Sequence, residues 1–161
     1  MRVPTQVRRR LPRLRNRRTR TREAPTLVRS TLPFRYDACL RLGGLGDVQE
    51  TVFELTGLSA SHAHRKGDPF GRRGSVRKED LWLLESPLGE RASHDEHLQW
   101  LWNQIKPHHQ QFQELLQCAA WADICLGCLS ESPYPVLSVD PGSLHIVREL
   151  NLALSFNFTT V

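Results

Sequence analysis

The segment FRYDACLRL at residues 34–42 constrains the fold more than any other stretch, because apolar and polar side chains alternate along it. A period of two places successive side chains on opposite faces of a β-strand. The apolar side chains are Phe34, Tyr36, Ala38, Leu40 and Leu42, and the side chains between them are Arg35, Asp37, Cys39 and Arg41. We therefore predict a half-buried strand, in a sheet that packs one face against a hydrophobic core.

Turn and capping residues divide the rest of the chain into short elements. Ser93 and Glu96 form a capping-box pattern at the start of one helix. We predict helices at 47–57, 93–107, 108–122 and 140–150, and further strands at 58–65, 81–86, 123–130, 136–139 and 152–158. This order predicts an α+β fold, with a mostly antiparallel sheet of about five to six strands and helices packed on one face. The predicted core includes Trp82, Leu98, Leu101, Leu154 and Phe156.

Positive charge is concentrated at the N-terminus. Residues 1–33 hold 11 Arg and one Glu, whereas the remaining residues carry a net charge of −5. Dense like charges and four prolines oppose folding there, so we expect residues 1–33 to be a disordered tail and 34–161 to be a single domain. The tail either binds nucleic acid electrostatically or is a leader translated from upstream of the true start. No signal peptide or membrane span is apparent, so we expect a cytoplasmic protein with reduced cysteines.

Cysteine and histidine spacing gives little support for a metal site. Cys125 and Cys128 have the spacing of zinc ligands, but no second pair accompanies them. On the predicted strand 123–130 their thiols point to opposite faces. His94 and His97 share a face at a helix start, where a simple polar first turn is the alternative to a metal site. We predict no bound metal and no cofactor.

The chain lacks a nucleophile elbow, a dinucleotide fingerprint and a P-loop, so we predict no catalytic residues. Residues 65–78 instead form a basic, glycine-rich loop. Such a loop either binds an anion through arginines and backbone N–H groups or pairs its charges locally. We expect Asp68 to accept backbone N–H bonds while the arginines project outward, and Trp82 to anchor a partner or fill the core. The candidate binding residues are Arg65, Lys66, Asp68, Arg72, Arg73 and Trp82.

Four segments, taken together, resemble a bacterial family catalogued as domain of unknown function 4279. They are RKGDP at 65–69, DLWLLES at 80–86, HLQWLWNQIKP at 97–107 and LNLALSFNF at 150–158. The resemblance extends over about residues 34–160. It implies one compact α+β domain, often the whole of a small bacterial protein, and it implies no activity.

We therefore expect a small non-catalytic binding domain with a protein partner, in a setting such as bacterial defence or toxin neutralisation. The alternative is an enzyme or sensor that acts on an anionic small molecule through residues 65–78. Nucleic-acid binding through the arginine-rich tail is a third hypothesis.

Overall fold

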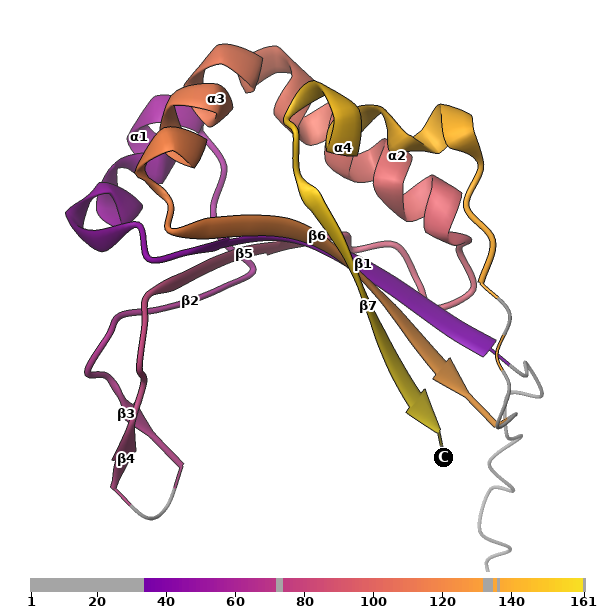
Figure 1. Cartoon of the computed structure of the whole chain (residues 1–161), viewed down its shortest axis with the longest axis horizontal. Coiled ribbons are helices and arrows are strands. Elements are labelled where there is room, and N and C mark those ends of the chain that lie inside the picture. The colour runs from indigo at the N-terminus through magenta and orange to yellow at the C-terminus, as the bar shows by residue number, and fades with distance from the viewer. Residues whose placement is uncertain (1–33, 72–73, 132–134, 136, 161) are drawn as a thin grey trace, which may run out of the picture. The chain divides into compact units, whose positions relative to one another are not determined.

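A five-stranded sheet lies beneath a layer of helices (Figure 1). The structure is a computed structural model that describes residues 34–71, 74–131, 135 and 137–160. The sheet has the order β2-β5-β1-β6-β7, and only β6 and β7 pair in parallel. Its strands are β1 (Phe34–Gly43), β2 (His62–His64), β5 (Leu81–Glu85), β6 (Trp121–Ser130) and β7 (Ala153–Thr160). The predicted α+β fold with a mostly antiparallel sheet is confirmed.

The helices all lie on one face of this sheet (Figure 1). They are α1 (Val52–Thr56), α2 (His94–Ile105), α3 (His109–Cys118) and α4 (His145–Glu149). Three 3₁₀ turns, at Gly46–Thr51, Lys106–His108 and Pro141–Leu144, lead into α1, α3 and α4. The basic loop forms a separate small hairpin of β3 (Pro69–Phe70) and β4 (Ser75–Val76).

Local sequence signals explain where the helices begin and end. The Ser93 hydroxyl accepts the backbone N–H of Glu96, and the Glu96 carboxylate accepts the backbone N–H of Ser93 at 2.7 Å, so the predicted capping box is present. Gly57 ends α1 with φ of 68°, a left-handed conformation that glycine adopts without strain. These contacts fix the helix ends without help from distant residues.

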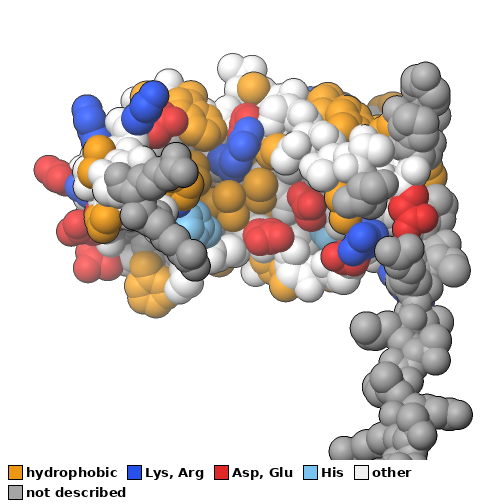
Figure 2. Space-filling model, turned by 90° about the horizontal axis from the view of Figure 1, so that it is seen from below, with side chains coloured by type: hydrophobic (Ala, Val, Ile, Leu, Met, Phe, Trp, Pro, Cys, Tyr) orange, Lys and Arg blue, Asp and Glu red, His pale blue; other side chains and the backbone are white. Residues whose placement is uncertain are grey.

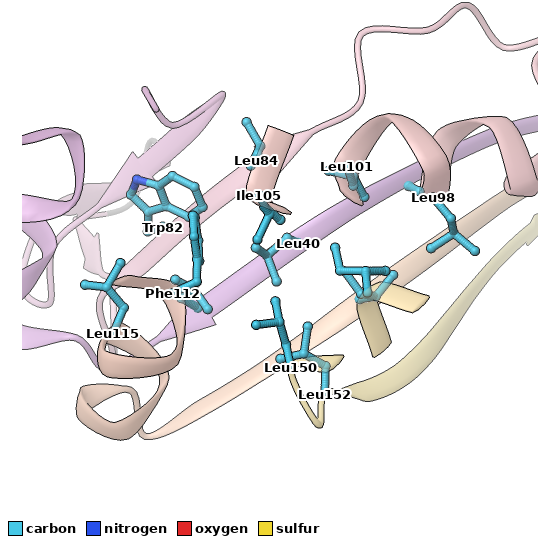
Figure 3. Packing of buried hydrophobic residues seen from close by; sticks show 14 of the residues in the cluster. Leu40, Trp82, Leu84, Leu98, Leu101, Ile105, Phe112, Leu115, Leu150 and Leu152 are labelled. Atoms are coloured by element: carbon cyan, nitrogen blue, oxygen red, sulfur yellow. The ribbon is translucent and has the colours of Figure 1, made fainter. Parts of the chain in front are cut away.

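The core lies between the sheet and the helices (Figure 3). Leu40 and Leu42 of β1 are fully buried, as the alternation predicts. Trp82 is only 3% exposed and meets Phe112 of α3 edge-on, with 6.2 Å between ring centroids. Leu98 and Leu101 of α2 are fully buried, so three of the five predicted core residues are confirmed.

Phe156 is a wrong core prediction, since it is 47% exposed, and Leu154 is only half-buried. Phe156 lies opposite the buried Leu126, so it does sit on the helix side of the sheet. β7 is an edge strand, however, and its C-terminal half runs away from α4 (Figure 1). Phe156 thus lies on the face that faces the helices, but none of the helices that the structure describes covers this part of the sheet.

The predicted strand at 136–139 is also wrong, because residues 137–139 form no strand and residue 136 lies outside the described residues. The connection from β6 contains α4 and returns to the same end of the sheet, as parallel strands require. The predicted helix at 108–122 stops at Cys118, and Trp121 already belongs to β6. The predicted strand at 58–65 is reduced to His62–His64.

The predictions for residues 1–33 lie outside the described residues. None of the helices that the structure describes is long and apolar enough to cross a membrane.

Candidate binding site on the open sheet face

The face of the sheet opposite the helices carries a network of polar side chains from three neighbouring strands (Figure 2). Arg41 of β1 donates to both carboxylate oxygens of Asp123 on β6, from Nε at 2.8 Å and from Nη2 at 2.6 Å. The Ser155 hydroxyl of β7 donates to the same carboxylate at 2.7 Å. A bidentate pair of this kind holds the guanidinium in one orientation.

Both members of this pair stay charged. Burial by itself raises the pKa of Asp123, but hydrogen bonds from Arg41 and Ser155 outweigh it and hold that pKa below its ordinary value. The hydrogen bond to Asp123 raises the pKa of Arg41 above its ordinary value. Arg41 is therefore a fixed positive charge on the open face.

Trp121 forms an aromatic wall beside Arg41. Its ring packs over Gly43, where a Cβ atom would collide with the indole. The indole Nε1 donates to Glu79 at 2.8 Å, and the Arg41 guanidinium lies 5.6 Å from the ring centroid. These contacts fix the orientation of the Trp121 ring. Because the residue remains 36% exposed, part of the ring faces solvent.

A hollow of about 310 Å³ opens beside this wall. Arg77 stacks over the Phe70 ring at 3.9 Å, and neither Arg77 nor Lys78 pairs with a carboxylate among the described residues. Burial, followed by the charges of Arg77 and His62, lowers the pKa of His64, so this imidazole is neutral at neutral pH. The lining residues are Arg41, His64, Arg77, Lys78, Glu79, Leu81 and Trp121. The hollow therefore has an excess of positive charge.

A second hollow, of about 440 Å³, brings together three of the predicted site residues, Arg65, Asp68 and Trp82. Arg65 does not project outward, which corrects the expectation from the sequence. Its guanidinium donates to the Gly46 carbonyl at 2.5 Å and lies 3.0 Å from Asp47 and 3.6 Å from Asp80. These carboxylates neutralise Arg65, so this hollow is a poorer anion site than the first.

Two aspartates organise the basic loop. Asp68 accepts the backbone N–H of Arg65 at 2.7 Å, as the sequence predicts. Asp80 accepts the backbone N–H groups of Lys66 at 2.7 Å and Gly46 at 3.1 Å, and these bonds lower its pKa. The sequence analysis missed Asp80, although a carboxylate directly before a strand and after a glycine-rich loop is a usable signal.

The other predicted site residues lie apart from the Trp121 hollow. Lys66 is exposed, and Trp82 belongs to the core and also lines the Arg65 hollow. Arg72 and Arg73 lie outside the described residues. Trp121, Arg77 and Lys78 were not predicted as site residues, because Trp121 was assigned to a helix and the register between β1 and β6 was unknown.

The prediction that the Cys125 and Cys128 thiols point to opposite faces is confirmed, since Cys125 lies opposite Cys39 on the open face and Cys128 lies opposite Tyr36 on the helix side. Asp95 and Glu96 give α2 the acidic first turn that the sequence predicts, but His94 and His97 are buried. His94 Nε2 donates to the Gly127 carbonyl at 2.9 Å. Among the residues that the structure describes, no group of three potential metal ligands converges.

Residues 34–160 match the family described as Domain of unknown function (DUF4279). The chain belongs to this family. The DUF4279 match confirms the resemblance seen in the sequence, and it includes all the strands and both hollows. No curated protein and no solved structure matches the chain.

Proposed function

We propose that this domain is a binding module that holds an acidic segment of a protein partner in the Trp121 hollow. The observation that carries the proposal is the charge there: Arg77 and Lys78 lack carboxylate partners among the described residues and face the hollow beside an exposed aromatic ring. Arginine and lysine at such a site form charge-assisted hydrogen bonds with carboxylates. Arg41 lies beside them, but Asp123 neutralises it, so Arg77 and Lys78 supply the free positive charge of the hollow.

The size of the hollow favours a side chain of a partner over a complete small molecule. A volume of about 310 Å³ is at the lower end of the range for pockets that enclose ligands. The half-buried Leu81 and the exposed ring of Trp121 provide apolar surface next to the cations. A carboxylate can thus bind Arg77 and Lys78 while the neighbouring residues of the partner pack on Leu81 and Trp121.

The nucleophilic groups of the domain favour binding over catalysis. Burial, together with the nearby Cys125, raises the pKa of Cys39 to about 12, so this thiol is protonated at neutral pH. Ser86 and His97 are hydrogen-bonded at 3.0 Å, but both are buried and closed to a substrate. A protonated thiol and a buried Ser86–His97 pair are not activated nucleophiles. These features support a binding module.

A peptide-display library panned on the full chain tests the proposal. We expect enriched peptides to combine Asp or Glu with an apolar or aromatic residue, and to bind more weakly as salt is added. The double variant Arg77→Glu, Lys78→Glu should lose these peptides at least about tenfold in affinity. Lys106→Glu, at an exposed position outside the hollow, is the matched control.

Enrichment of peptides without acidic residues, or binding that the double variant does not change, would contradict the proposal. Phosphate and citrate are included as competitors, because displacement by either at low concentration would assign the hollow to an anionic small molecule, the enzyme or sensor alternative. A role in bacterial defence is tested separately, by whether genes of this family lie beside toxin genes.

A further inference from the structure

β7 presents a long free edge at one side of the sheet. It is the terminal strand of the order β2-β5-β1-β6-β7, and it has no second partner strand within the described part of the chain. Its eight residues include no proline and no charged side chain, the features that usually protect an edge strand. β2, at the opposite edge, has only three residues. The β7 edge is therefore open to pairing with another strand.

The same strand exposes two aromatic rings. Phe156 is 47% and Phe158 50% exposed, and the two rings stack with 6.3 Å between centroids. They lie opposite Leu126 and Cys128, which places both on the helix side of the sheet. Half-exposed phenylalanines on an edge gain stability when a partner covers them.

The β7 sequence is complementary to itself in an antiparallel arrangement. A register centred on Asn157 places Phe156 of one copy opposite Phe158 of the other, and Ser155 opposite Thr159. The two Phe156–Phe158 pairs then form a cluster of four rings on one face. Asn157 meets its own counterpart on the other face, and no like charges oppose each other.

We propose that this domain forms a two-fold symmetric dimer through antiparallel pairing of β7 with β7 of a second copy. The pairing joins two five-stranded sheets into one continuous sheet and covers the Phe156 and Phe158 rings. Symmetric pairing satisfies the edge N–H and C=O groups of both chains with the same contacts, as a two-fold interface requires. The occupant of the edge is thus a second copy of this chain.

Analytical ultracentrifugation of the full chain across a dilution series tests this inference. We expect the average mass to rise with concentration from 18.5 kDa toward twice that value. In the variant Phe156→Lys, Phe158→Lys, each lysine faces a lysine of the other copy, so the mass should stay at that of a monomer. Phe53→Lys, also at an exposed phenylalanine but away from both β7 and the Trp121 hollow, is the control and should dimerise like the parent chain.

Cysteine cross-linking tests the register. In the proposed dimer the two copies of residue 157 lie about 5 Å apart at Cα, whereas the two copies of residue 159 lie about 14 Å apart. A disulfide requires a Cα separation below about 7 Å. Under mild oxidation Asn157→Cys should therefore give a covalent dimer, and Thr159→Cys should give no more than the parent chain.

Three results would overturn the inference: a monomer at every concentration, a dimer that the double lysine variant leaves intact, or equal cross-linking at 157 and 159. A monomer in which the β7 amide groups exchange slowly with solvent would assign the edge to another segment of the same chain. Neither the sedimentation nor the cross-linking experiment involves the Trp121 hollow. Their outcomes are therefore independent of the proposed function.

Discussion

Two tryptophans show how position in the fold decides the role of a residue. Trp82 on β5 points toward α3 and is almost fully buried, whereas Trp121 on β6 points to the open face and is 36% exposed. Both follow from the alternation of side chains along a strand. The first stabilises the core, and the second forms the wall of the proposed binding site.

Trp82→Ala should lower the free energy of unfolding by about 3–5 kcal/mol, because it removes a large ring from a closed core next to Phe112. Urea denaturation followed by circular dichroism measures the change. Phe53→Ala, which removes an aromatic ring that is 59% exposed, is the comparison and should cost far less. Equal losses for the two variants would contradict the assignment of Trp82 to the core.

The four cysteines should differ sharply in reactivity. Cys118 is exposed, Cys125 and Cys128 are buried, and burial raises the pKa of Cys39 to about 12. At pH 7.5 we expect iodoacetamide to modify Cys118 first, with the other three thiols reacting only after denaturation. Peptide mass spectrometry identifies the modified residue, and rapid modification of Cys39 would show that the open face is less closed around it than the structure indicates.

At the scale of an element, local signals and tertiary packing determine different properties. The capping box at Ser93 fixes the start of α2, and Gly57 fixes the end of α1. In contrast, the exposure of Phe156 on β7 depends on the distance that α4 extends over the sheet. The local sequence can thus determine where a helix or strand begins and ends, whereas the elements that pack against it determine which of its residues are buried.

Ser93→Ala should destabilise the domain by about 1 kcal/mol, because it removes the hydroxyl that accepts the Glu96 N–H. Thermal unfolding measures the effect, and Ser75→Ala, at an exposed position of β4, serves as the control. Substitution of Ser93 by Asp, which also caps helices well, should restore most of the stability. Failure of this rescue would argue against a capping role.

At the scale of the molecule, buried titratable groups should make the domain sensitive to acid. Burial, then the charge of His94, lowers the pKa of His97, so below about pH 6.5 the unfolded chain binds a proton that the folded chain does not. The pKa of Asp123 is also lowered on folding, so its contribution is present above about pH 4 and is lost as the pH falls through its folded pKa.

We therefore expect stability to fall in two stages between pH 7 and pH 3. His97→Leu should reduce the slope between pH 7 and pH 5, and Asp123→Asn should reduce it below about pH 4. His64, whose pKa is lowered too, is changed to Gln in a parallel series to separate its share of the first stage. Urea midpoints at each pH measure the slopes, and a His97→Leu profile parallel to that of the parent would refute the His97 assignment.

The sequence by itself determined the positions of the main strands and helices and which face the residues of β1 occupy. It did not determine every element, since Trp121 belongs to β6 and not to a helix, and residues 137–139 form no strand. The alternation in β1, the caps of α1 and α2, the burial of Trp82 and the opposite faces of Cys125 and Cys128 all follow from local periodicity and local hydrogen bonds. The four short segments that resemble the family, in their order along the chain, also predicted the family correctly.

Only the tertiary structure decided which strands are neighbours and what covers each face. Arg41, Asp123 and Ser155 meet because β1, β6 and β7 are adjacent, although Arg41 and Ser155 are 114 positions apart. Arg65 meets Asp80 because β2 pairs with β5, and it meets Asp47 of the 3₁₀ turn before α1. A period of two predicts which face of the sheet a side chain occupies, but it does not predict which strands pair or in what register. The site on the open face and the free edge of β7 therefore became visible only when the pairing of the strands was known.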